Sequence, residues 1–199
     1  MDREQALDDL VAKEEIRQAM ARYSRGIDRR DEELLKSVYH EDSTDDHGWG
    51  LAAGGWDIAA LVRRDGKGFP DEWKLTSHFL GQHLIEVAGD DAVSEVYFVA
   101  TNIVEHDGRD WAQVSAGRYL DRWERRGGAF RIAHRQVIYD WWRTDVNDTP
   151  WPGPDHEVPK MYHGAPTLDT STNVYGTPGP DDKSYELLRR LPATTRSRA

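Results

Sequence analysis

The sequence predicts one α+β domain in which helices come first and an antiparallel sheet follows. Apolar residues recur at helical spacing near the N-terminus, and from Leu75 onward they alternate in short runs that are typical of strands. Helices followed by a meander of strands favour the α+β class. With 199 residues, of which 38% are hydrophobic, the chain is long enough for one domain with its own core.

The first two helices are predicted to form a helix–turn–helix pair. The spacing of apolar residues predicts an amphipathic helix over residues 5–27 that ends near Gly26. Either Asp28 or Asp31 can then cap a second helix that runs to about Tyr39, because aspartate is favoured at N-caps.

The next segment, residues 40–50, is rich in turn formers and acids, so we expect a loop with a short strand. A third helix is predicted from Trp56 to about Arg64. The loop also contains the ligand types that a divalent cation takes, namely His40, Asp42, Asp45, Asp46 and His47. Acidic loop residues are more often solvated, so we predict no metal site and place Asp46 or His47 at the rim of a pocket.

Four strands are predicted for the sheet. The alternating runs cover residues 83–87, 92–105, 113–124 and 130–142. Glycine-containing turns join the first run to the second and the third to the fourth, which predicts two hairpins.

The C-terminal part of the chain differs in composition from the rest. All but one of the nine prolines lie between Pro150 and Pro192, mixed with Gly, Asp, Thr and Ser. Since a proline-rich segment cannot pair inside a sheet, we divide the chain into a domain at 1–144 and an extended tail at 145–199. Three aromatic residues are candidates to anchor the tail on the domain or on a neighbouring subunit: Trp151, Tyr162 and Tyr175.

Composition excludes several classes of function. The net charge of −10 argues against general binding to nucleic acid or anionic membranes, which need a basic face. No apolar run approaches the ~18 residues of a membrane span, and the N-terminus does not resemble a signal peptide, so we predict a cytoplasmic protein. The absence of cysteine excludes disulfides, thiol nucleophiles and cysteine-ligated metals. Eight Trp and eight Tyr favour an aromatic-lined cavity for a small molecule.

Four residues are candidates for chemistry. Tyr23 and Asp28 lie five residues apart at the end of the first helix, and His78 precedes a strand that can point it inward. A histidine with a carboxylate on its other nitrogen is suited to proton abstraction near neutral pH. Arg135 lies on the last strand, where an inward arginine would need a carboxylate or an anionic leaving group. Each also has a structural alternative: Asp28 as a helix cap, Tyr23 as a core aromatic, and His78 as a structural histidine.

Several runs resemble the SnoaL-like family of the nuclear transport factor 2-like superfamily. They occur in that family's order at residues 21–42, 77–87, 89–97 and 117–135, and the resemblance covers roughly residues 8–142. It implies a cone-shaped barrel of a curved antiparallel sheet packed against three N-terminal helices. It also implies a relation to cofactor-free lyases: bile acid 7α-dehydratase, hexachlorocyclohexane dehydrochlorinase, scytalone dehydratase and formaldehyde lyases of lignin-derived compounds.

The resemblance also implies roles for the four candidates. His78 and Asp28 match an acid–base dyad, Tyr23 matches a tyrosine five positions before the aspartate, and Arg135 matches an arginine that assists the leaving group. One departure is that Ala100 or Thr101 occupies the place of a further aspartate of the bile acid enzyme.

The resulting hypothesis is a lyase that needs no cofactor or metal. Its substrate would be an aromatic or polycyclic hydroxy compound that loses water or formaldehyde, bound by Trp49, Trp56, Tyr97, Thr101, Tyr119 and Tyr139. By resemblance we expect a homodimer or homotrimer. Two alternatives remain: a binding protein of the same fold, and a structural subunit like the small subunit of ring-hydroxylating dioxygenases.

Overall fold

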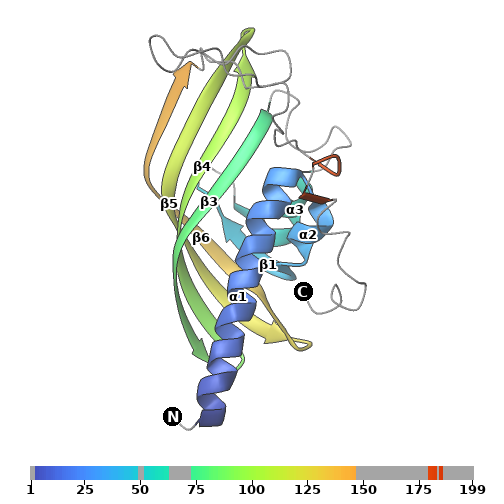
Figure 1. Cartoon of the computed structure of the whole chain (residues 1–199), viewed down its shortest axis with the longest axis vertical. Helices are drawn as coiled ribbons and strands as arrows, with labels where there is room; N and C mark the ends of the chain where they lie inside the picture. The colour runs from blue at the N-terminus through green and yellow to red at the C-terminus, as the bar shows by residue number, and fades with distance from the viewer. Residues whose placement is uncertain (1–2, 49–51, 63–72, 147–178, 183, 186–199) are drawn as a thin grey trace, which may run out of the picture.

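A layer of helices covers one face of a curved, open sheet (Figure 1). The computed structural model describes residues 3–48, 52–62, 73–146, 179–182, 184 and 185. Six strands form one sheet in the order β2-β1-β6-β5-β4-β3, so that β2 and β3 lie at its edges. The predicted α+β class and the packing of N-terminal helices on a curved sheet are therefore confirmed.

The first helix, α1 (Arg3–Arg29), is longer than predicted. It buries one face against the sheet, with Ile16 and Met20 fully covered, as its apolar spacing requires. Gly26 does not end the helix. A Cβ atom there would lie 2.6 Å from Cγ of Leu35, so Gly26 permits the next helix to approach closely. The helix ends three residues later, before Arg30 with its positive φ of 52°.

The second helix, α2 (Glu32–Lys36), is shorter than predicted. Its N-cap is Asp31, whose Oδ1 accepts a hydrogen bond of 3.0 Å from the backbone N–H of Leu34. Tyr39, the predicted end of this helix, is instead the first residue of a strand. Because Asp31 caps α2, the carboxylate of Asp28 is not needed there.

The third helix, α3 (Gly55–Ala60), was predicted from Trp56 to about Arg64. Residues 63 and 64 lie outside the described part of the chain. None of the helices in the described ranges is long and apolar enough to cross a membrane.

The sheet combines two short strands with four long ones. The strand predicted between residues 40 and 50 is β1 (Tyr39–Asp46), which pairs with β2 (Ala52–Gly54). The long strands are β3 (Trp73–Ala88), β4 (Asp91–His106), β5 (Arg109–Arg126) and β6 (Ala129–Val146). The long strands pair antiparallel as predicted, whereas β1 runs parallel to β6.

Breaks in register bend the long strands around α1. One lies between Leu80 and His83 of β3, and another between Ala116 and Gly117 of β5. A Cβ atom on Gly117 would lie 1.9 Å from the carbonyl oxygen of Ile138, so only glycine permits this close approach. The concave face that results holds the core, which includes Tyr23, Leu35, Val96, Tyr119, Trp123, Phe130 and Ile132.

The described residues near the C-terminus lie against the end of α1. Arg25 donates a hydrogen bond of 2.8 Å to the hydroxyl of Ser184, and Arg29 lies 3.3 Å from the carboxylate of Asp182. The hydroxyl of Tyr185 donates to Asp31 at 3.2 Å. The three predicted anchors of the tail lie outside the described residues: Trp151, Tyr162 and Tyr175.

Candidate active site

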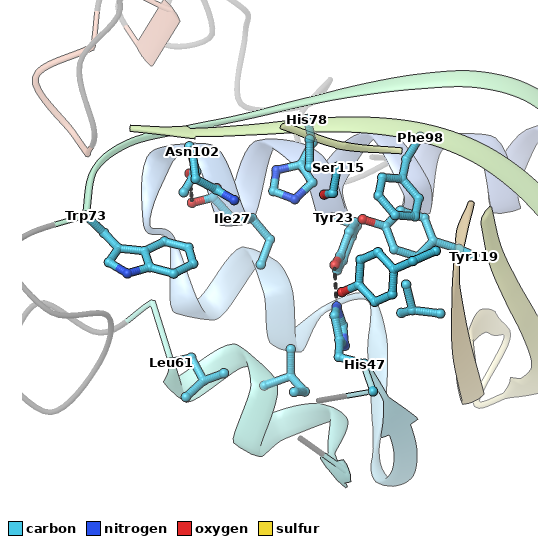
Figure 2. Close-up of a pocket in the computed structure, with 16 residues that line it drawn as sticks. Tyr23, Ile27, His47, Leu61, Trp73, His78, Phe98, Asn102, Ser115 and Tyr119 are labelled. Atoms are coloured by element: carbon cyan, nitrogen blue, oxygen red, sulfur yellow. Dashed lines mark hydrogen bonds between the residues drawn. The ribbon is translucent and has the colours of Figure 1, made fainter. Parts of the chain in front are cut away.

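A cavity of about 190 Å³ lies between the end of α1, the concave face of the sheet and α3. Figure 2 shows its lining, with His78 on the wall formed by the long strands and His47 on the opposite wall. Apolar side chains make up a large part of this lining: Ile27, Ile58, Leu61, Trp73, Phe98, Ala100 and Val137. The polar groups of the cavity are few and come from Tyr23, His47, Thr76, His78, Asn102, Ser115, Tyr119 and Tyr139.

Asp28 holds His78 with both of its carboxylate oxygens. Oδ1 lies 2.7 Å from Nδ1 of the imidazole, and Oδ2 accepts a hydrogen bond of 3.0 Å from the backbone N–H of His78. A carboxylate accepts hydrogen bonds, so Nδ1 carries the proton and Nε2 is left for the cavity. The two side chains are 14% and 11% exposed, which keeps the pair largely shielded from solvent.

Two features of the fold bring this pair together across fifty residues of sequence. The continuation of α1 beyond Gly26 places Asp28 in the last turn of the helix, beside β3. On β3, His78 pairs with Ala100 of β4, which also lines the cavity, so His78 faces inward.

Tyr23 lies one and a half turns before Asp28 and is 1% exposed. Its hydroxyl lies 3.5 Å from Nε2 of His47, and its ring packs edge-on against His78 with centroids 6.3 Å apart. Burial raises the pKa of Tyr23 to about 12, although the nearby charge of Arg135 opposes this rise. The phenol therefore stays protonated near neutral pH and can donate a hydrogen bond.

Arg135 faces inward but does not line the cavity. Its guanidinium donates to both oxygens of Asp121, at 2.6 and 2.8 Å, and it is 0% exposed. It lies 4.2 Å from the ring centroids of both Tyr23 and Tyr119, which cover it on the cavity side. Burial alone would lower the pKa of Arg135, but the Asp121 carboxylate raises it well above its ordinary value. The prediction that Arg135 contacts a leaving group does not agree with this position, because the rings of Tyr23 and Tyr119 lie between its guanidinium and the cavity.

The predicted substrate-binding residues divide into three groups. Tyr119 and Tyr139 line the cavity, whereas Trp49 lies outside the described residues. Three others lie elsewhere: Trp56, Tyr97 and Thr101. Thr101 alternates on β4 with the lining residues Ala100 and Asn102, and Tyr97 precedes the lining residue Phe98, so both point to the outer face. Trp56 lies beneath Lys36, whose Nζ is 5.6 Å from the ring centroid. The prediction that Trp56, Tyr97 and Thr101 bind the substrate is therefore corrected, because none of them lines the cavity.

The residues of the predicted acidic loop do not gather into one cluster. Nε2 of His40 lies 2.9 Å from the carbonyl oxygen of Glu124, and Asp42 accepts a hydrogen bond from Arg126. Asp45 instead contacts Nδ1 of His47. Within the described ranges, no three His, Asp or Glu side chains gather in a way that could hold a metal ion.

Sequence reasoning placed His47 only at a pocket rim and missed its pairing with Asp45. The signal was present, because residues two apart in a strand lie on the same side, and Asp45 and His47 have that spacing. Ser115 was not selected either, and Asn102 was not counted among the substrate-binding residues, although they lie on the same strand faces as the buried residues Tyr119 and Ala100.

The arrangement as a whole can take a proton from a bound molecule. It provides an oriented histidine, a neutral phenol and an apolar cavity, with a second histidine on the opposite wall. The helices packed on a curved open sheet, with a cavity between them, define the cone-shaped fold of the nuclear transport factor 2-like superfamily.

Comparison with known proteins identifies the family. Residues 8–136 match the SnoaL-like domain, and the chain therefore belongs to the SnoaL-like family, as the sequence resemblance predicted. A search of curated proteins found no significant match.

Solved structures with the same fold include named lyases. Hexachlorocyclohexane dehydrochlorinase (LinA) type 2 aligns with a TM-score of 0.65 and 17% identity, over 76% of this chain and 99% of that chain. A protein from Novosphingobium aromaticivorans named as a candidate scytalone dehydratase aligns with a TM-score of 0.58 and 21% identity, over 67% and 87%. An NTF2-like protein with a cystatin-like fold from the same species gives a TM-score of 0.51 and 28% identity, over 66% and 83%. These similarities establish the shared fold.

Proposed function

We propose that this chain is a cofactor-independent lyase that removes a proton and a small leaving group from an aromatic hydroxy compound. The observation that carries the proposal is the two-point contact of Asp28 with His78, which directs Nε2 of His78 to the cavity. Two of the structures with this fold are named as a dehydrochlorinase and a candidate dehydratase, which supports a lyase activity.

The proposed step is an elimination. Nε2 of His78 takes a proton from a carbon next to a carbonyl, the C–H electron pair forms a C=C bond, and the bond from the neighbouring carbon to oxygen breaks. The oxygen leaves with its electron pair and is protonated to water. In a retro-aldol variant the proton comes from a hydroxyl, the O–H electron pair forms the C=O bond of formaldehyde, and the C–C bond breaks with its electron pair passing to the carbonyl as an enolate, which is then protonated. Asp28 stabilises the imidazolium that forms on His78.

The size of the cavity narrows the substrate class. Its 190 Å³ is below the roughly 300–1,000 Å³ of pockets that hold drug-sized ligands, which favours one or two rings over a steroid. Aromatic and aliphatic side chains such as Trp73, Phe98 and Leu61 can pack against a ring, while Asn102 and Ser115 can hydrogen-bond to a carbonyl or hydroxyl.

The test uses 3-hydroxyindan-1-one, a bicyclic ketone whose dehydration to inden-1-one changes its absorbance. We expect wild-type turnover, a loss on the order of 10²–10⁴-fold in His78→Gln, and a smaller loss in Asp28→Asn. His134→Gln is the matched control, because His134 is an exposed histidine that bonds Thr44 rather than a group of the cavity. Wild-type rates in folded His78→Gln would overturn the proposal, and tight binding without turnover would favour a binding protein.

Copies of this chain are also expected to assemble through one face of the sheet. The outer face of the sheet carries large exposed apolar side chains, including Phe79 at 72% and Tyr97 at 47% exposure, with Leu84, Val93 and Val99. Apolar patches of this kind are typical of surfaces that pair with another chain. We propose that this face forms the contact of a homodimer or homotrimer.

The division of the chain into a domain at 1–144 and a tail at 145–199, and its cytoplasmic location, remain predictions.

A further inference from the structure

The second histidine of the cavity also has a carboxylate partner. His47 follows β1 on the wall opposite His78 (Figure 2) and its side chain is 19% exposed. Its Nδ1 makes a close contact with Oδ1 of Asp45, and its Nε2 lies 3.5 Å from the hydroxyl of Tyr23. His47 thus has the same kind of carboxylate partner that orients His78.

Asp45 is placed to act as a charged acceptor. Its side chain is 0% exposed, and Tyr39 donates a hydrogen bond of 2.7 Å to its second oxygen. Burial opposes ionisation of Asp45, but the hydrogen bond and charge of His47, together with Arg135, outweigh it and lower the pKa of this carboxyl. Since the ionised group only accepts hydrogen bonds, Nδ1 of His47 carries a proton and Nε2 is available to the cavity.

Arg135, the buried cation near Asp45, is directed mainly at another carboxylate, so His47 is the cationic partner that contacts Asp45 directly. Arg135 directs Nε and one terminal nitrogen at Asp121 and only its other terminal nitrogen at the hydroxyl of Tyr39, 3.2 Å away. A protonated His47 would form an ion pair with Asp45, and this charged form is the one that a general acid requires.

Tyr23 lies between the two histidines. Its hydroxyl faces His47 and its ring edge packs against His78, so a substrate in the cavity can contact both imidazoles from opposite sides. We propose that His47, oriented by Asp45, is the general acid that protonates the leaving oxygen, while His78 removes the proton from carbon. This inference rests on the proposed elimination and assigns the residue that the departing group meets.

The proton balance of the step is complete within the cavity. His78 gains the proton from the substrate carbon, and the C–O electron pair leaves with the oxygen. The proton on Nε2 of His47 passes to that oxygen, and water departs. The two histidines return to their starting forms when His78 releases its extra proton to solvent and Nε2 of His47 takes up a proton from solvent.

The test compares two substrates that differ only in the leaving group. Hydroxide needs a proton in order to depart as water, whereas chloride leaves as a stable anion. We therefore compare 3-hydroxyindan-1-one with 3-chloroindan-1-one, which yield the same inden-1-one. His47→Gln should lower kcat on the order of 10²-fold or more for the hydroxy ketone and less than about threefold for the chloro ketone. His78→Gln should lower both rates, and His134→Gln should lower neither.

The outcomes separate the two proposals. Equal losses on both ketones in His47→Gln, or a higher KM with unchanged kcat, would overturn the role of His47 and leave the elimination standing. Wild-type rates in His78→Gln, or no turnover of either ketone by the wild-type protein, would overturn the elimination and with it this inference. Circular dichroism of each variant verifies that it is folded.

A measurement without substrate tests the same arrangement. In ¹⁵N-histidine-labelled protein, NMR should show a protonated Nδ1 on His47 that loses proton occupancy in Asp45→Asn, while the signals of His78 stay unchanged. An unprotonated Nδ1 on His47 in the wild-type protein would overturn the inference even if the elimination is observed.

Discussion

The buried pair of Arg135 and Asp121 gives the sharpest test of what lies beneath the cavity. We predict that Arg135→Met strongly destabilises the fold, whereas Arg135→Met combined with Asp121→Val largely restores stability. The single change leaves a fully covered carboxylate without the two hydrogen bonds of 2.6 and 2.8 Å that it accepts. Replacing both members leaves an apolar contact instead.

The expected size follows from this geometry. Removing one member of a buried ion pair costs about 3–5 kcal/mol, and each cation–π contact, here with Tyr23 and Tyr119, contributes roughly 0.5–2 kcal/mol. For a protein whose total stability is about 5–15 kcal/mol, this is a large fraction. Replacement of the whole pair by apolar side chains is typically neutral to stabilising, so the double variant should recover most of the loss.

The assay is urea unfolding followed by tryptophan fluorescence at neutral and acidic pH. Burial already raises the pKa of Asp121, and without Arg135 this pKa rises further. A group with a raised pKa in the folded state costs stability as pH rises through that value, so the deficit of Arg135→Met should shrink on acidification. A loss below about 1 kcal/mol at neutral pH would refute this account. Loss of turnover in a folded double variant would show instead that Arg135 acts in the chemistry.

Three further predictions follow from the positions of individual side chains. Asp31→Ala should cost about 1 kcal/mol of stability by removing the N-cap of α2, in addition to the hydrogen bond from Tyr185, with turnover unchanged because Asp28 holds His78; a large loss of activity would contradict this division of roles. Tyr97→Ala and Thr101→Ala should keep kcat and KM within about twofold, since both side chains point away from the cavity, and steady-state kinetics would expose an error in the strand faces. Phe79→Glu should lower the mass measured by light scattering, while Leu7→Glu, at another exposed apolar position on α1, should not; an unchanged oligomer in the first variant would exclude this face.

The long strands were predictable because alternation and glycine turns are local signals. The turn at Gly127 and Gly128 has positive φ at both residues, of 61° and 85°, which is the conformation that paired glycines favour. The end of α1 was less predictable. Gly26 is a helix-stop signal in isolation, and only the approach of Leu35, distant in space until the chain folds, explains why it lies inside the helix.

The candidate site was predictable at the level of residue types and less so at the level of contacts. Asp28 and Asp31 were equally suitable as caps, and the choice depends on the path of β3, which brings His78 to one of them. The burial rules predicted only that an inward Arg135 would need a carboxylate or an anionic leaving group, whereas its direction and its capture by Asp121 depend on the cross-strand register of β5 and β6. Thr101 was chosen on the wrong face, although β4 pairs with β5 without a register break, so the alternation that buries Val96, Phe98 and Ala100 extends to this part of the strand.

The end of α1 contacts two segments that are remote from it in the chain. His78 of β3 contacts Asp28, and Asp182 and Ser184 contact Arg29 and Arg25. Helix ends fray readily, and a frayed turn here would separate the carboxylate from its imidazole while the sheet remained intact. Asp182 and Ser184 therefore help to hold the helix turn that carries Asp28, so removing their contacts should loosen the bond between Asp28 and His78.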